Sequence, residues 1–337
     1  MKALVLTGKE RVEVQEMPAP QAAAGEVLLR VSTAGICGSD IHGFLGHSPR
    51  RKPGLILGHE AVGVVAELGP GVKNLRMGQR VYVNPLISCG KCEACLSGKE
   101  NCCVSWRLLG MDRVHGAYAE FVAVPASQLR PIPDEVSDQR AVWAEPLANI
   151  VHCFRISMNE KPKSMAILGA GTMGALGLTV AKSRGIEKVV VVDKNEARLD
   201  AANQIGADAA INIDRQDAKA QIGAVDYIFD AVGVSSMRRL ALDICKRGGR
   251  IAFLGMGENE SSLPFIDMIR NEQAIFTSFA YTPADFAESV RLIESGTGPL
   301  LKWTEHRKLD EGQESFSKMA HNPAGTLKLL FNIGASA

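Results

Sequence analysis

Two hydrophobic patterns divide the chain. Over residues 1–150, short runs in which apolar and polar residues alternate are interrupted by glycine and proline, which is typical of strands with one buried face. The clearest predicted strands are Val27–Val31, Ala61–Leu68, Arg80–Val83 and Ala119–Val124. We therefore expect a β-rich region here.

From Ser164 onward, continuous apolar runs alternate with segments of helical periodicity. The predicted strands are Met165–Leu168, Val189–Val192, Tyr227–Ala231 and Ile251–Leu254, and the predicted helices are Met173–Arg184, Glu196–Ile205 and Met237–Lys246. Such alternation indicates a parallel sheet covered on both faces. A further helix predicted at Ala284–Glu294 marks another change of pattern. We expect an α/β protein in which a sheet domain at 151–283 is inserted between two parts of a β-rich domain, 1–150 and 284–337.

Composition excludes several classes of function. A net charge of +1 over 337 residues gives no electrostatic basis for binding nucleic acid or an anionic membrane. No apolar stretch reaches the length of a membrane span, and the first residues lack the apolar core of a signal peptide. Eight cysteines without such a segment favour a reducing cytoplasm.

Four of the eight cysteines lie close together in the sequence. Cys89, Cys92, Cys95 and Cys103 follow the pattern C-x2-C-x2-C-x7-C, and four thiolates in so short a loop are what a tetrahedral zinc site requires. Disulfides are the alternative, but they require an oxidising compartment. The pattern predicts a closed, structural zinc lobe at 89–103.

A glycine-rich turn predicts a dinucleotide site. Gly169, Gly171 and Gly174 form G-x-G-x-x-G between a predicted strand and a predicted helix, and Asp193 ends the next strand. Glycines at these places allow a tight turn, close approach of a pyrophosphate, and packing of helix on strand, while the acid binds the ribose hydroxyls of NAD and repels the 2′-phosphate of NADP. The alternative for Asp193 is a turn or cap residue. Lys194 and Arg198 follow closely in the sequence. As cofactor-binding residues they would weaken the preference for NAD, but a solvated loop and helix face is the favoured alternative.

A second metal site is predicted from residues that are far apart in the sequence. Cys37 in G-I-C-G-S-D and His59 in L-G-H-E offer a thiolate and an imidazole, and Glu145 in A-E-P-L-A can complete an open zinc site. Each residue also has a simpler explanation, since a lone cysteine is most often buried and inert.

Several motifs together resemble the zinc-containing medium-chain alcohol dehydrogenases. Gly58-His59-Glu60 with Gly63, Gly69 and Val72 match the G-H-E-x2-G-x5-G-x2-V signature of that family, and residues 37–42 match its first metal-ligand segment. The cysteine lobe and the glycine-rich turn follow in the family's order, so the resemblance covers essentially the whole chain. It implies a Rossmann domain, a doubly wound parallel sheet, inserted into a GroES-like catalytic domain.

The resemblance also implies the ligands of the catalytic metal. Cys37 and His59 resemble its zinc ligands, and Glu145 resembles the carboxylate ligand of the sorbitol-dehydrogenase-like branch. Glu60 resembles the neighbouring carboxylate that approaches or enters the metal shell during turnover. Two zinc ions per chain, one catalytic and one structural, are therefore expected.

Three further residues resemble the family's proton-handling groups. Asp40 would hydrogen-bond His59 and fix its tautomer, and Ser39 and His42 resemble the relay that carries the alcohol proton to solvent. A glutamate-bound water is the alternative route for that proton. The implied reaction transfers hydride from a secondary alcohol of a polyol, sugar alcohol or sugar acid, with or without a phosphate, to NAD. The family further implies a homodimer or homotetramer, formed through a segment near Ile275–Tyr281.

The substrate is the least determined property. Sorbitol-type members carry an arginine before a tyrosine where this chain has Phe279-Ala280-Tyr281, and threonine dehydrogenases share the same general plan. Arg50, Arg51 and Lys52 are candidates for binding a phosphate or carboxylate of the substrate, or form a solvated loop. Trp106 and Phe44 are candidates for lining a substrate pocket, or belong to the core.

Two other functions fit part of the sequence. One is an NADPH-dependent carbonyl or alkene reductase of the same superfamily, against which Asp193 argues. The other is a non-catalytic nucleotide-binding protein, structural or redox-sensing. A binding module has no need of Cys37, His59 and Glu145 together, so the number of zinc ions per chain distinguishes it from a dehydrogenase.

Overall fold

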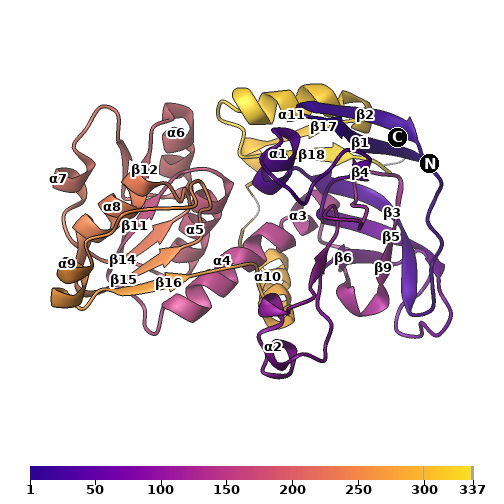
Figure 1. Cartoon of the computed structure of the whole chain (residues 1–337), viewed down its shortest axis with the longest axis horizontal. Helices are drawn as coiled ribbons and strands as arrows, with labels where there is room; N and C mark the ends of the chain where they lie inside the picture. The colour runs from indigo at the N-terminus through magenta and orange to yellow at the C-terminus, as the bar shows by residue number, and fades with distance from the viewer. Residues whose placement is uncertain (299, 335–337) are drawn as a thin grey trace. The chain divides into compact units, whose positions relative to one another are not determined.

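The chain forms two compact units in a computed structural model that describes residues 1–298 and 300–334 (Figure 1). The first unit comprises Met1–Glu145, Ser289–Ser295 and residues 300–334, and the second comprises Pro146–Glu288 and Gly296–Gly298. The chain therefore leaves the first unit near the start of helix α4 (Ala144–Ser157) and returns to it within helix α10 (Pro283–Glu294).

The second unit is built on a six-stranded parallel sheet in the order β13-β12-β11-β14-β15-β16. Its strands are β11 (Ser164–Leu168), β12 (Lys188–Asp193), β13 (Ala209–Asn212), β14 (Val225–Asp230), β15 (Cys245–Phe253) and β16 (Ala274–Thr277). Helices lie on both faces of the sheet (Figure 1), namely α5 (Thr172–Ser183), α6 (Glu196–Ile205), α7 (Ala218–Ile222), α8 (Ser235–Ile244) and α9 (Phe265–Arg270). The strand order reverses between β11 and β14, as in a doubly wound dinucleotide-binding sheet. The predicted α/β fold class is confirmed.

One predicted helix of this unit is too long. The sequence pattern runs from Met237 to Lys246, but α8 ends at Ile244 and β15 begins at Cys245. The pairing of β15 with β14 is irregular, because Val225 pairs with Cys245 whereas Tyr227 pairs with Arg250. The polar residues between these two pairs interrupt the apolar pattern of β15. The start of β15 could therefore not be predicted from the hydrophobic pattern.

The first unit is built mainly from antiparallel strands. Its largest sheet has seven strands, in the order β10-β6-β5-β3-β18-β17 with β9 also paired to β3, beside sheets β2-β1-β4 and β7-β8. The strands are β1 (Lys2–Gly8), β2 (Arg11–Glu16), β3 (Glu26–Gly35), β4 (Leu55–Ile56), β5 (Glu60–Leu68), β6 (Arg80–Val83), β7 (Leu86–Ile87), β8 (Arg107–Leu108), β9 (Phe121–Pro125), β10 (Leu129–Pro131), β17 (Thr304–Arg307) and β18 (Lys328–Asn332). The α-helices are α1 (Gly38–Phe44), α2 (Glu93–Leu96), α3 (Asp138–Ala141) and α11 (Gly312–His321).

Strand β18 connects distant parts of the sequence. It pairs with β3 antiparallel, through Leu330 and Gly35, and with β17 in parallel. The sequence pattern identified β3 and β5 but described this C-terminal part only as short pieces.

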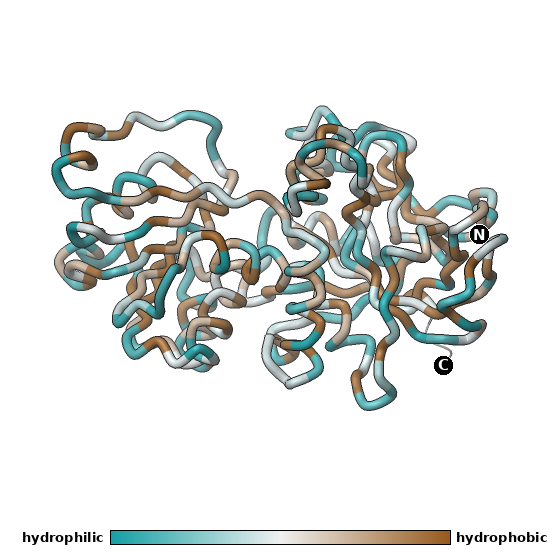
Figure 2. Tube along the Cα trace, turned by 90° about the horizontal axis from the view of Figure 1, so that it is seen from below, coloured by the Kyte–Doolittle hydropathy of each residue, from teal (hydrophilic) through white to brown (hydrophobic). Residues whose placement is uncertain are grey.

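Hydrophobic residues recur along the interior of each unit, and many outer loops are hydrophilic (Figure 2). Phe44, a candidate pocket residue from the sequence, is fully buried in the core of the first unit. Among the described residues, no helix combines the length and apolar character needed to cross a bilayer.

Candidate active site

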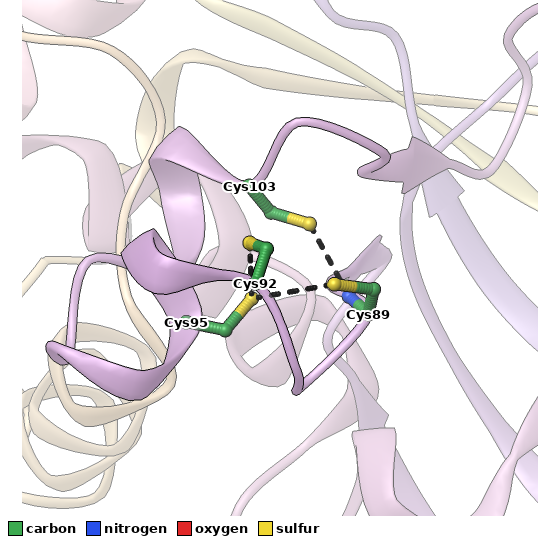
Figure 3. A group of neighbouring side chains, drawn as sticks. All are labelled: Cys89, Cys92, Cys95 and Cys103. Carbon is green, nitrogen blue, oxygen red and sulfur yellow. Dashed lines mark hydrogen bonds between the residues drawn. The ribbon is translucent and has the colours of Figure 1, made fainter.

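The four cysteines of the lobe gather around one point (Figure 3). All four sulfur atoms lie within 4.8 Å of one another, with Cys95 Sγ 3.5 Å from Cys92 Sγ and 3.9 Å from Cys89 Sγ. Four thiolates at zinc-bonding distance from a central ion would lie roughly 3.8 Å apart. All eight cysteines of the chain are free thiols, so the arrangement fits a closed zinc site rather than disulfides.

A bound cation would complete the electrostatics of this lobe. Backbone amides of Lys91 and Cys92 lower the pKa of Cys89 to about 6, whereas burial raises the pKa of Cys95 to about 11. The Cys89 amide also donates to Cys103 Sγ at 3.3 Å (Figure 3). Four thiolates this close repel one another, and a bound divalent ion removes that repulsion.

A second group of ligand atoms is formed by Cys37, His59 and Glu60, which lie within 4.8 Å of one another. Cys37 caps the N-terminus of α1, and His59 and Glu60 stand at the start of β5. His59 is 3% exposed and Glu60 is 1% exposed. Burial lowers the pKa of His59, but the negative charges of Asp40 and Cys37 raise it well above its usual value. The pocket therefore favours a positive charge, and its donors suit zinc.

Asp40 lies beside His59 in the interior of the first unit. Its Oδ1 lies 3.5 Å from His59 Nδ1, and its Oδ2 accepts hydrogen bonds from the Tyr118 hydroxyl at 2.7 Å and the Cys37 amide at 3.3 Å. Gly58, just before His59, has φ +96°, and a Cβ there would lie 2.6 Å from the Tyr118 ring. The G-H-E motif thus needs its glycine both for backbone conformation and for room.

Lys328 is part of this pocket, and the sequence analysis did not find it. Its Nζ is 2.7 Å from both carboxylate oxygens of Glu60 and donates to the Ile36 carbonyl at 3.2 Å. The side chain is 3% exposed. The available signal was a single lysine within the otherwise apolar run T-L-K-L-L-F.

Glu145 lies outside the group of ligand atoms that are within 4.8 Å of one another. It stands in the first turn of α4 and is 7% exposed. Burial lowers the pKa of Lys328, but the charge of Glu60, followed by those of Cys37 and Glu145, raises it above its usual value. Glu145 is therefore close enough to act on the pocket, and its role as a zinc ligand stays a prediction.

The two predicted relay residues lie on α1. Ser39 is half-buried, and its Oγ accepts a hydrogen bond from Arg51 Nη2 at 3.0 Å. His42 is largely exposed. Its partial burial, and then the nearby His47 and Arg51, lower its pKa. His42 is thus neutral near pH 7 and is able to accept a proton.

The three adjacent cations of the 50–52 loop do not act together. Arg50 makes a bidentate ion pair with Asp112 and stacks on Trp106, its guanidinium 4.0 Å from the ring centroid. Arg51 is 5% exposed and lies 3.5 Å from Asp40. Only Lys52 is an exposed cation. The prediction that residues 50–52 form a solvated loop is wrong for Arg51. Its guanidinium is buried, where the negative charge of Asp40 stabilises it.

The glycine-rich turn has the geometry that a dinucleotide needs. Gly169 follows β11 with φ +96°, and a Cβ on Gly174 would lie 1.7 Å from the Gly169 carbonyl oxygen. Gly171 caps α5, and no backbone atom lies within 4 Å of the place a Cβ would take on it. The loop therefore leaves room for a pyrophosphate at the N-terminus of α5.

Asp193 and Arg198 both lie at this turn. Asp193 Oδ2 accepts from the Ala170 amide at 2.7 Å, and its Oδ1 accepts from the Asn195 amide at 2.9 Å. Arg198 Nη1 lies 3.7 Å from the place where a Cβ on Gly171 would be. Both side chains thus lie beside the glycine-rich turn, and their contact with a cofactor ribose stays a prediction.

Comparisons with known proteins agree with this architecture. Residues 23–134 match the model of the alcohol dehydrogenase GroES-like domain, and residues 172–295 match that of the zinc-binding dehydrogenases. Sorbitol dehydrogenase of Bacillus subtilis is 31% identical over 98% of this chain and 96% of its own length. L-threonine 3-dehydrogenase of Chromobacterium violaceum is 31% identical over 98% and 99%.

Solved structures give the same result. A zinc-binding dehydrogenase from Sinorhizobium meliloti, bound to NADP, matches with a TM-score of 0.91 and 28% identity over 98% of both chains. A short chain alcohol dehydrogenase from E. coli with NADH has a TM-score of 0.90 and 29% identity over 98% and 99%. Galactitol-1-phosphate dehydrogenase from Escherichia coli has a TM-score of 0.91 and 25% identity over 98% and 100%.

Proposed function

The chain belongs to the family of zinc-binding alcohol dehydrogenases, and on that premise we propose that it oxidises a secondary alcohol of a polyol, sugar alcohol or sugar acid with NAD as the hydride acceptor. The observation that carries the proposal is the cluster of Cys37, His59 and Glu60 within 4.8 Å of one another, in which His59 and Glu60 are buried and Cys37 is half-buried. A protein that only binds a nucleotide has no need of such a cluster.

Cys37 and His59, with a carboxylate from Glu145 or Glu60, would hold the catalytic zinc. Bound there, zinc supplies Lewis acidity that lowers the pKa of a substrate hydroxyl, and the nicotinamide supplies the redox chemistry. Asp40 keeps the His59 imidazole in one orientation. Lys328 balances the charge of Glu60 and holds both of its oxygens.

The chain's own residues also remove the proton of the alcohol. Ser39 lies two residues from Cys37 in the first turn of α1 and carries a hydroxyl that both accepts and donates. His42, one turn further along, has a lowered pKa and accepts the proton near neutral pH. Together they support a relay from the substrate toward solvent.

Asp193 supports NAD rather than NADP as the cofactor. Its carboxylate is held beside the glycine-rich turn by two backbone amides, where it would bind ribose hydroxyls and repel a 2′-phosphate. Arg198 lies at the same turn and offsets part of that repulsion.

Similarity to the sorbitol and galactitol-1-phosphate enzymes supports the polyol class. Similarity to the threonine dehydrogenase supports an alternative substrate, an amino acid that carries a secondary alcohol. Because Arg50 and Arg51 are paired inside the first unit, only Lys52 of the three adjacent cations remains to attract a charged substrate.

The test combines metal analysis with NADH formation on polyols, sugar acids, their phosphate esters and threonine. Two zinc ions per chain and oxidation of a polyol or sugar acid are expected. Cys37→Ser should lose one zinc and turnover, whereas Cys102→Ser, which changes an exposed thiol outside both clusters, should retain both. If the protein holds two zinc ions but oxidises only threonine, the proposed polyol substrate class is rejected. If the wild type holds only one zinc ion per chain, the proposed catalytic zinc site is rejected.

We also propose that the protein forms a homodimer or homotetramer through the edge of the second unit's sheet. Strand β16 is the last strand of that sheet, and the neighbouring helix α9 exposes Phe265, Ile266 and Ile269, each more than 60% accessible. Contiguous exposed apolar side chains of this kind mark interaction surfaces.

A further inference from the structure

Arg51 is buried beside the helix that carries the proton relay. The residue is 5% exposed, its Nη2 donates to Ser39 Oγ at 3.0 Å, and its Nε lies 3.5 Å from Asp40 Oδ1. Arg51 is neither a proposed zinc ligand, nor a cofactor-binding residue, nor a member of the proposed proton relay.

Helix α1 is shaped to admit this side chain. A Cβ on Gly43 would lie 2.4 Å from Arg51 Cδ and 3.0 Å from its Cβ. Burying a guanidinium is costly unless it is paired, and Asp40, itself fully buried, supplies the opposite charge. The missing side chain of Gly43 thus leaves room for Arg51, and the ion pair with Asp40 holds it next to Ser39.

The contact limits what the Ser39 hydroxyl can do. A serine hydroxyl has one proton and two acceptor lone pairs, and a guanidinium only donates. Arg51 therefore occupies one lone pair, and the hydroxyl proton is directed to another acceptor. One lone pair is left to receive a proton from the substrate.

We propose that Arg51 is a positioning residue that sets the direction of proton transfer through Ser39. This inference rests on the proposed function. As the O–H bond of the alcohol breaks, its proton bonds to Ser39 Oγ, and the proton that Ser39 already carried leaves for His42, a cofactor hydroxyl or water. When the C–H bond breaks, its electron pair and hydrogen would leave together as hydride, which a bound nicotinamide would accept. Arg51 keeps all of its protons throughout.

The contact itself is tested by nitrogen-15 NMR of arginine side chains in the zinc-loaded full chain. Arg51 should give a guanidinium signal that is protected from exchange, is absent in Arg51→Lys, and shifts or loses protection in Ser39→Ala. Arg50→Lys should remove a different signal. Protected arginine signals that are all unchanged in Ser39→Ala would overturn the inference, and this comparison does not depend on whether Arg51→Lys folds.

The role is tested by kinetics on the alcohol that the wild type oxidises. Arg51→Lys retains the charge near Asp40 but not the forked geometry, so kcat should fall roughly tenfold to a hundredfold while the zinc content and the KM for NAD stay unchanged. Arg50→Lys, the matched control, should remain within about twofold of the wild type, because its side chain lies against Trp106 and Asp112.

A double-mutant cycle separates positioning from general damage. In a Ser39→Ala background, Arg51→Lys should change kcat by less than about twofold, because the hydroxyl that it orients is gone. Losses that multiply would overturn the inference. If the wild type oxidises no alcohol, the proposed function fails, and the NMR comparison still decides whether Arg51 holds Ser39.

Discussion

Lys328 is the cation that neutralises Glu60 in the buried pocket of the first unit. Both carboxylate oxygens of Glu60 are 2.7 Å from its Nζ, and the two side chains are 3% and 1% exposed. Removing one member of such a pair leaves a buried charge without a partner, which costs far more than the loss of a surface pair.

Lys328→Met should therefore lower the free energy of unfolding by about 3–5 kcal/mol, with part of the loss recovered when zinc is added, since the metal supplies another positive charge. Urea unfolding with and without zinc measures both effects. Lys318→Met removes one partner of Glu305 at a partly exposed site, where Arg307 also pairs with Glu305, and should cost less than about 1 kcal/mol. Equal losses for the two variants would contradict this interpretation of the pocket.

Asp193 determines the choice of cofactor in our proposal. Asp193→Asn keeps an oxygen that can accept from the Ala170 amide but removes the charge that repels a 2′-phosphate. The ratio of kcat/KM for NADP to that for NAD should rise by about tenfold to a hundredfold, as expected when one charged hydrogen bond is lost. Asp200→Asn, an exposed position on α6, should leave the ratio unchanged. An unchanged ratio in Asp193→Asn would remove this residue from the ribose site.

We expect the order of the zinc lobe at 89–103 to depend on its metal. The lobe contains only the short helix α2 and a 3-10 turn, and its Leu96 side chain is exposed and adds nothing to a core. Cys95→Ser should reduce the zinc content by one ion per chain and make the lobe sensitive to limited proteolysis. Cys102→Ser should do neither. A lobe that resists proteolysis in Cys95→Ser would mean that packing alone orders it.

Helices α4 and α10 are tied together within the second unit by one carboxylate. Asp285 receives hydrogen bonds from Arg155, at 2.6 and 3.0 Å, and lies 2.8 Å from His152 Nδ1. Burial raises the pKa of Asp285, but the hydrogen bonds from His152, Arg155 and Thr282 lower it well below its usual value.

Because the folded-state pKa of Asp285 is depressed, its contribution to stability is complete above about pH 4, where it is ionised in both states. That contribution is lost as the pH falls toward the folded-state pKa. Asp285→Asn should cost about 2 kcal/mol near pH 7 and progressively less on acidification, as measured by denaturant unfolding at several pH values. Asp243→Asn, which breaks a surface pair with Arg239, should cost less than about 1 kcal/mol at any of them. A loss for Asp285→Asn that does not depend on pH would contradict this account.

At the scale of elements, the sequence predicted what depends on local periodicity. The parallel strands β11 and β12 and the helices α5 and α6 lie within one or two residues of the predicted ranges. It missed β18 and the burial of Arg51, because both depend on contacts between segments distant in the sequence or on an ion pair that no local pattern encodes. The sequence could nominate Cys37 and His59, which the structure brings together with Glu60, because each lies in a contiguous motif. Lys328 was missed because it lies 268 residues along the chain from Glu60, the carboxylate to which it donates.

For the whole molecule, α9 is the surface on which we expect copies of the chain to associate. Ile269→Glu places a charge on a side chain that is 73% exposed, so it should not disturb the monomer but should oppose association. Light scattering should give a mass near 36.1 kDa for the variant and two or four times that for the wild type. Met77→Glu, at a 57% exposed position in the first unit, should leave the mass unchanged. A wild-type monomer would reject the proposal.

The position of β18 between β3 and β17 also affects how the protein is made. Gly35 of β3 pairs with Leu330, so its partner is translated about 295 residues later, roughly 15–60 seconds at ordinary rates of synthesis. Throughout that interval the nascent chain exposes an unpaired strand edge, which invites aggregation. The second unit can fold before the first unit is complete. The cysteine lobe can bind its metal early, because its four ligands are close together in the sequence. Glu60 gains its partner Lys328 only when β18 leaves the ribosome.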